Sequence, residues 1–272
     1  MVYSPASKRA TMQMRRIAHN IEELVMPIDT PATALVAQLS QAGFRPSERL
    51  VKQIMQQGPV AYPALLDLAL RIVDLHEDAP QCFGPVHALR LLGDLGHPDM
   101  IPALLGALPI PIYTDPSGEM VDVPAQLWAQ EVLQIIGRCP NAVEALLALV
   151  DDPEATDTVR GSALQGLGYA VTFTGEREIA LAAGRERLGR EDYSKSLVAA
   201  VVNLLADLGD KESYSAIMAA YRSGRVDQTR MPAADARQLL MNKGRPNLDC
   251  VKHPLWERYE QHGPVPGAQP LS

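Results

Sequence analysis

The sequence predicts an all-α protein in which antiparallel helix pairs stack into an α-solenoid. Of the 272 residues, 47% are hydrophobic and only 5% are aromatic. A composition dominated by aliphatic residues and alanine favours helices over sheets. Apolar residues recur at helical spacing in paired segments, and the pair itself returns along the chain, which is typical of a solenoid. One continuous domain is therefore expected rather than two.

The clearest helix pair is predicted between residues 84 and 108. Gly96-His97-Pro98 breaks this segment, because proline suits the first turn of a new helix. Each side of the break carries apolar residues at i, i+3, i+4 and i+7, which predicts two amphipathic helices in an antiparallel hairpin. The two stripes are Ala88, Leu91, Leu92 and Leu95, then Ile101, Leu104, Leu105 and Leu108.

This unit returns three times downstream. Gly93, Gly137, Gly168 and Ala206 occupy equivalent places, 44, 31 and 38 residues apart. In VRGSALQGLGYA the small residues are expected to let a neighbouring helix approach closely. The segment 204–221 repeats 91–108 in register, whereas the second helix of the third unit, near 176–189, is less regular. The later stripes are Val132, Ile135, Ile136 and Cys139; Val143, Leu146, Leu147 and Val150; Ala163, Gly166, Leu167 and Ala170; and Tyr214, Ile217, Met218 and Tyr221.

The remaining segments flank these repeats. Residues 1–29 are expected to form an N-terminal helix or arm, and 30–243 a single domain with clear repeats over about 84–225. Three helices over 31–75 would form degenerate capping repeats, because terminal repeats need caps. Residues 244–272 are rich in proline and glycine. There, LWERYE is expected to dock Leu255, Trp256 and Tyr259 over the last repeat, with a disordered end.

The segments ALRLLGDLGHPDMIPALLGAL and VRGSALQGLG resemble HEAT-like repeats. The resemblance covers residues 80–225 well and 30–78 loosely. It departs from the pattern in the third unit, where Gly175 replaces the usual proline-bearing turn. The resemblance implies a right-handed, armadillo-like superhelix. Proteins of this group are mostly interaction scaffolds, with a few enzymes among them, so the resemblance specifies the fold far better than the function.

The sharpest interruption is PIPIYTDPSGEMVDVP, residues 109–124, whose prolines forbid a helix. Insertions in solenoids map to one face, often the binding face. An aromatic anchor with acidic neighbours would suit a protein partner, and a solvated loop stiffened by its prolines is the alternative. The predicted partner-binding residues are Tyr113, Asp115, Glu119, Asp122, Trp128 and Glu131.

The charge is unevenly distributed. Residues 53–157 hold 15 acidic and 3 basic residues, whereas 158–243 hold 10 acidic and 12 basic residues. Such asymmetry attracts a basic partner to the acidic half and repels nucleic acid there. Ordinary solubility charge on outer surfaces is the alternative interpretation.

Constellations for other chemistry are absent from the sequence. Cys82, Cys139 and Cys250 form no C-x-x-C pair, and three separate thiols fit a reducing cytoplasm. No run of eighteen apolar residues suggests a membrane span. His76-Glu77 is the only His-Glu pair, so the ligands of a HEAT-repeat di-iron hydroxylase are missing. No metal or cofactor is expected. The other histidines, His19, His87, His97, His253 and His262, are expected at surface or capping positions.

We therefore expect a non-enzymatic scaffold that binds another protein, a basic one on the acidic half. The alternative is an enzyme built on a HEAT-like scaffold. A bilin-lyase-like activity is compatible with the sequence, whereas the acidic middle argues against a DNA-glycosylase-like one, which needs a basic groove. A structural subunit that pairs with itself is a third hypothesis, and the sequence leaves the oligomeric state open.

Overall fold

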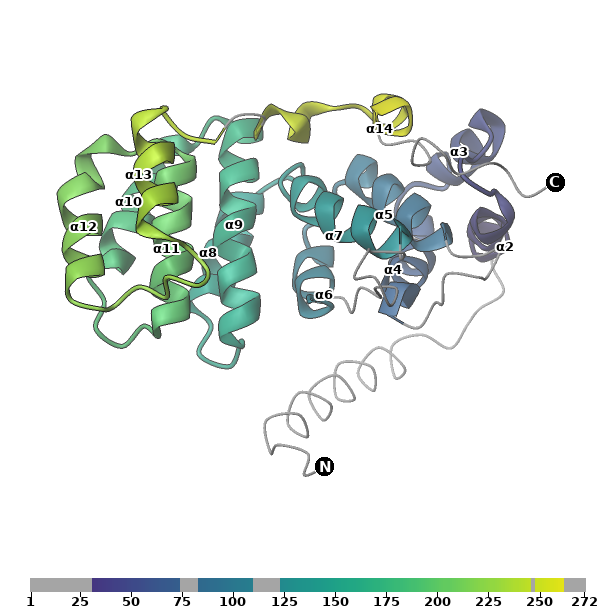
Figure 1. The fold of residues 1–272 in the computed structure, drawn as a ribbon. Coiled ribbons are helices and arrows are strands. Elements are labelled where there is room, and N and C mark those ends of the chain that lie inside the picture. Colours follow the sequence, from purple (N-terminus) through teal and green to yellow (C-terminus); the bar gives the residue numbers. More distant parts are fainter. Residues whose placement is uncertain (1–30, 74–82, 110–122, 246–247, 262–272) are drawn as a thin grey trace, which may run out of the picture.

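The structure is a computed structural model that describes residues 31–73, 83–109, 123–245 and 248–261. Within these ranges all regular secondary structure is helical, with no β-strand (Figure 1). The first part contains α2 (Pro31–Ala37), η1 (Gln38–Gln41), α3 (Glu48–Met55), η2 (Gly58–Ala61), α4 (Tyr62–Leu70), η3 (Arg71–Val73), α5 (Gly84–Leu95) and α6 (Met100–Gly106). The second contains α7 (Val123–Ile136), α8 (Ala142–Asp151), α9 (Asp157–Thr174), α10 (Arg177–Leu188), α11 (Lys195–Asp207), η4 (Lys211–Ser213), α12 (Tyr214–Arg222), α13 (Ala233–Met241), η5 (Leu248–Lys252) and α14 (Leu255–Gln261).

The helix boundaries follow local sequence signals. Ser47, Thr156 and Ser194 cap α3, α9 and α11, because each hydroxyl oxygen accepts a hydrogen bond from the backbone N–H three residues later. Gly96 and Gly175 end α5 and α9 with positive φ angles of 65° and 84°, a conformation that glycine adopts without strain. The eight helices expected between residues 84 and 222 are all present.

Alternate helices pack against one another in chain order. α5 contacts α7, α7 contacts α9, α9 contacts α11, and α11 contacts α13. The intervening helices add to this row: α8 packs on α9, and α10 packs on both α9 and α11. Figure 1 shows α9, α10, α11 and α13 running side by side, whereas α5 and α7 are seen more nearly end-on. One apolar core extends through the whole row, from Ala32 on α2 to Tyr259 on α14.

Glycines set the spacing between neighbouring helices. A Cβ built on Gly93 of α5 would lie 3.0 Å from the Ile135 side chain of α7. One built on Gly137, directly after α7, would lie 2.9 Å from Tyr169 and Ala170 of α9. Close packing is expected from the sequence at the glycines of GSALQGLG. There a Cβ built on Gly166 would lie 3.3 Å from Leu146, whereas one built on Gly168 would have only Leu248 nearby, at 4.0 Å.

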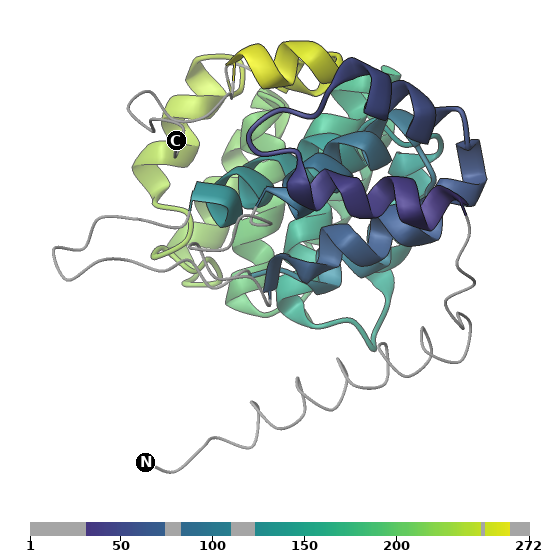
Figure 2. The same ribbon diagram turned by 90° about the vertical axis from the view of Figure 1, so that its right-hand side faces the viewer.

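The C-terminal segment does not dock over the last repeat as expected. After α13 the chain turns back, because Arg245 donates a backbone hydrogen bond to Asp207 O at the end of α11. η5 then contacts α9 and α7, and α14 contacts α5 (Figure 1). Figure 2 confirms that α14 lies beside the N-terminal helices, next to α3. We call residues 248–260 the C-terminal strap.

Candidate functional site

The predicted partner-binding residues fall into two groups. Tyr113, Asp115, Glu119 and Asp122 lie outside the described residues, so their role in binding remains a prediction. Trp128 and Glu131 are on α7, and their side chains are almost entirely buried, at 0% and 1% exposure.

Trp128 holds α7 against α4. Its indole Nε1–H donates a hydrogen bond of 3.0 Å to Ala69 O. The expectation that Trp128 faces a partner is corrected by this position. A tryptophan amid Leu127, Val132 and other apolar residues of α7 gains more by burial in the core than at the surface.

Glu131 is the centre of a buried ionic cluster. Its carboxylate accepts two hydrogen bonds from the Arg90 guanidinium of α5, the one from Nε measuring 2.8 Å. Arg258 Nη1 of α14 lies 3.9 Å from Glu131 Oε2, and all three side chains are only 2% exposed. Glu131 is thus engaged by two arginines of its own chain, which corrects its expected placement on a partner-binding surface.

The two arginines respond differently to the same environment. Burial opposes the charged form of both. At Arg90 the hydrogen bonds that it donates to Glu131, together with the negative charge of that carboxylate, outweigh burial and raise the pKa above its ordinary value. At Arg258 burial prevails and lowers its pKa. Arg258 also donates to Gln134 Oε1 at 2.9 Å and to Cys250 O at 3.0 Å, which compensates part of its desolvation.

His87 is a fully buried neighbour of this cluster, not the surface or capping residue expected. Its Nε2–H donates to Gly43 O at 2.8 Å, because a carbonyl can only accept. Nδ1 therefore accepts from the Tyr259 hydroxyl of α14, at 2.9 Å. Burial lowers the pKa of His87 to about 4, so the imidazole is neutral near pH 7.

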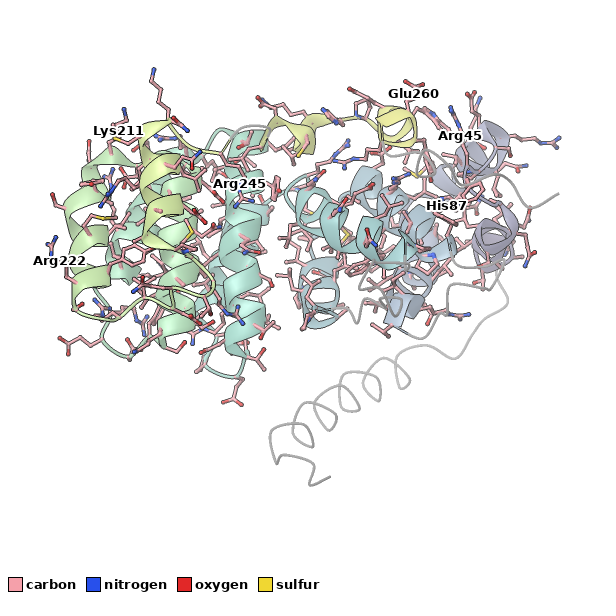
Figure 3. All side chains as sticks on the ribbon, viewed as in Figure 1. Arg45, His87, Lys211, Arg222, Arg245 and Glu260 are labelled. Carbon is pink, nitrogen blue, oxygen red and sulfur yellow. The ribbon has the colours of Figure 1, made fainter. Side chains whose placement is uncertain are left out.

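Two aromatic rings of α14 pack against arginines from earlier in the chain. The Arg90 guanidinium carbon lies 4.4 Å from the centre of the Tyr259 ring, and that of Arg45 lies 5.1 Å from the centre of Trp256. The Trp256 and Tyr259 rings are 5.6 Å apart. Figure 3 shows Arg45, His87 and Glu260 at the end of the molecule where α3, α5 and α14 meet. The α14 cluster, as we use the term, consists of His87, Arg90, Glu131, Arg258 and Tyr259.

The chemistry of the α14 cluster is recognition of one helix by others. A carboxylate faces guanidinium groups, and a neutral imidazole faces a phenol, all away from water. Among the described residues no group of three or more histidine, cysteine, aspartate or glutamate side chains could hold a metal ion. No helix in the described ranges is long and apolar enough to span a membrane.

Arg90 and Arg258 are not among the residues that the sequence predicts to form a site, and Tyr259 is expected only to dock over the last repeat. Their partners lie far away in the chain, so no local motif links them. One signal was present: Arg90 stands in LRLLG and Glu131 in QEVLQII, each a charge within an apolar helical run. Charges in such runs are buried only when they are paired.

Ion pairs offset part of the charge of residues 53–157, the acidic half of the chain. Its three basic residues are all held by acids of the same half, as Arg71–Asp67, Arg90–Glu131 and Arg138–Asp94. Asp151 is bound by Arg187 and Arg190 from the other half. Further acids lie on α8, in the turn after it and at the first residue of α9, and all are exposed except Asp152, which is half-buried. We call this group the α8 acidic edge: Glu144, Asp151, Asp152, Glu154 and Asp157.

Comparisons with protein-family models, with curated proteins and with solved structures found no match.

Proposed function

We propose that this chain is a non-enzymatic scaffold whose helix pairs form a HEAT-like α-solenoid and which binds a basic protein partner at the α8 acidic edge. The packing of alternate helices in chain order supports the solenoid. A row of helix pairs offers an extended surface without requiring a catalytic centre. We further propose a cytoplasmic location, which the free thiols of Cys139 and Cys250 support.

One observation carries the electrostatic part of the proposal. The arginines of the acidic half are bound to Asp67, Glu131 and Asp94, none of which belongs to the α8 acidic edge. Within the described residues, Arg160 approaches Asp157, and Arg187 and Arg190 approach Asp151, whereas the edge itself holds five acids. A negative patch of this kind accelerates and orients the association of a positively charged protein.

The test compares two full-length variants with the same change in charge. The first, Glu144→Gln/Asp152→Asn/Glu154→Gln, neutralises the edge. The second, Glu176→Gln/Glu191→Gln/Asp235→Asn, neutralises exposed acids elsewhere. Proteins retained from a cell extract by the immobilised chains are identified by mass spectrometry.

We expect the unaltered chain and the second variant to retain the same basic protein, with retention falling as salt is raised. The first variant should lose it. Equal retention by both variants contradicts the role of the α8 acidic edge, and retention of no protein by any of the chains contradicts the scaffold function.

A further inference from the structure

α14 is held by the residue types that dominate binding between separate proteins. Trp256, Arg258 and Tyr259 make its aromatic and charged contacts, and tryptophan, arginine and tyrosine are the commonest hot-spot residues at protein interfaces. Arg258 is 1% exposed and Tyr259 is 5% exposed. An α14 helix thus binds its site as an interface helix would.

The surface that receives α14 is organised by residues outside the strap. Arg90 and Glu131 fix each other through two hydrogen bonds, and His87 is fixed by Gly43 O. The Glu131 carboxylate and His87 Nδ1 then face the strap, where they meet Arg258 and Tyr259. We call this surface, formed by Gly43, His87, Arg90, Glu131 and Gln134, the α14 site.

One hydrogen bond joins two residues of the strap itself and is kept wherever the strap binds. Arg258 Nη2 donates to Cys250 O, which ties α14 to η5 within the strap. A strap supplied by another chain would present the same arginine, the same phenol and the same indole.

We propose that the α14 site is a helix-recognition site and that the strap of a second copy of this chain can occupy it in trans, each copy giving Arg258 to the other's Glu131. Exchange of identical elements is a low-cost route to dimers, because every contact is reproduced in the exchanged form. The chain's own strap competes at an effective concentration on the order of millimolar. Exchange therefore becomes visible at high protein concentration or when the tethered helix is weakened. This proposal concerns a different surface from the α8 acidic edge and does not depend on it.

The first experiment measures binding of a fluorescent peptide of residues 248–261, with Cys250→Ser, to the full-length chain carrying Arg258→Ala/Tyr259→Ala. This variant keeps the α14 site and weakens its tethered occupant. We expect saturable binding, which is weaker on the unaltered chain because its site is filled.

A peptide with Arg258→Ala should bind at least about 30-fold more weakly, as expected for a hot-spot arginine. A peptide with Glu260→Gln, altered at an exposed position, should bind as the parent does. Absence of binding to the folded variant, or equal binding of the Arg258→Ala peptide, overturns the proposal. Circular dichroism establishes folding. If the double variant is unfolded, Trp256→Ala in the chain weakens α14 without removing Arg258, and the same peptides are compared on it.

The second experiment measures the molar mass of the unaltered chain by light scattering across concentrations. A dimer that grows with concentration supports exchange of the strap. Mixing the Glu131→Gln chain with the Arg258→Ala chain should give more dimer than either chain alone, because only the exchanged form restores one pair of Arg258 with Glu131. A chain that remains monomeric at millimolar concentration, or a mixture that dimerises no more than the separate variants, overturns exchange between copies.

Discussion

At the scale of single residues, the feature that sets this protein apart is a buried charge cluster. Arg90, Glu131 and Arg258 each expose 2% of the side chain, whereas the Arg71 and Asp67 side chains expose 61% and 60%. Removing one member of a buried ionic group leaves the others uncompensated in a medium of low dielectric constant. The same change at an exposed pair is screened by water.

We predict that Glu131→Gln lowers the free energy of unfolding by about 3–5 kcal/mol, because two buried arginines lose their anion. The matched control Asp67→Asn should change it by no more than about 1 kcal/mol. Urea denaturation of the two variants beside the unaltered chain measures both. Similar losses in the two variants would show that burial does not govern the cost.

We predict that His87 makes stability depend on pH in the mildly acidic range. Its pKa is lowered from 6.5 to about 4 in the folded state. The unfolded chain therefore binds the proton first, and stability present above pH 6.5 is lost as the pH falls towards 4. The loss amounts to about 3 kcal/mol over that window. Arg90 and Tyr259 face the imidazole, and the positive charge of Arg90 acts in the same direction.

The measurement is the difference in unfolding free energy between the unaltered chain and His87→Gln at several pH values from 7 to 4.5. Other titrating groups contribute to both chains, so the difference isolates His87. A difference that stays constant over this range would contradict the prediction.

At the scale of helices, the packing distance between neighbours is set by small residues at particular positions. Gly137 admits the backbone of α9. Gly161, the fifth residue of α9, has only Ala200 Cβ nearby, at 3.6 Å from a Cβ built on it. A methyl group added at these two glycines should therefore change the stability of the protein in opposite directions.

We predict that Gly137→Ala destabilises the protein by about 1–3 kcal/mol, because the added carbon meets backbone that cannot move freely. Gly161→Ala should stabilise it by about 0.5–1 kcal/mol, since alanine is the better helix residue and its methyl group fits. Thermal unfolding of both variants shows the signs. A stabilising Gly137→Ala would mean that α7 and α9 are less tightly packed than described.

At the scale of the whole molecule, the C-terminal strap joins ends of the row that are distant in sequence. Its η5 contacts α9 and α7, and its α14 contacts α5 (Figure 1). Arg258 donates to Gln134 on α7, and Arg138, two residues after the end of α7, donates to His253 O, so the strap is bound both to α7 and to the turn that follows it.

We predict that a chain ending at Arg245 is loosened locally. Amide hydrogen exchange should accelerate in α5 and α7, which lose the strap, and stay slow in α11 and α12, whose main packing partners are α9, α10, α13 and η4. Mass spectrometry of peptides from both chains measures this. A uniform change along the row, or none, would contradict a local role for the strap.

The helices could be predicted from the sequence because their signals are local. The stripes of α5 to α12, the cap at Ser47 and the break at Gly96 all involve residues within one or two helical turns. The candidate site could not be predicted in the same way. The partner of Glu131 on α14 lies 127 positions along the chain, and nothing near either residue indicates the other. The predicted loop residues, Tyr113 among them, remain untested.

The sequence by itself determined that the chain is helical, where most helices begin and end, and which faces are apolar, because helical periodicity and capping are properties of neighbouring residues. Only the tertiary structure decided which charges are buried and where α14 lies. Burying Glu131 or His87 costs desolvation free energy. Part of that loss is compensated by Arg258 and Tyr259, which contact them only when the strap packs on α5 and α7.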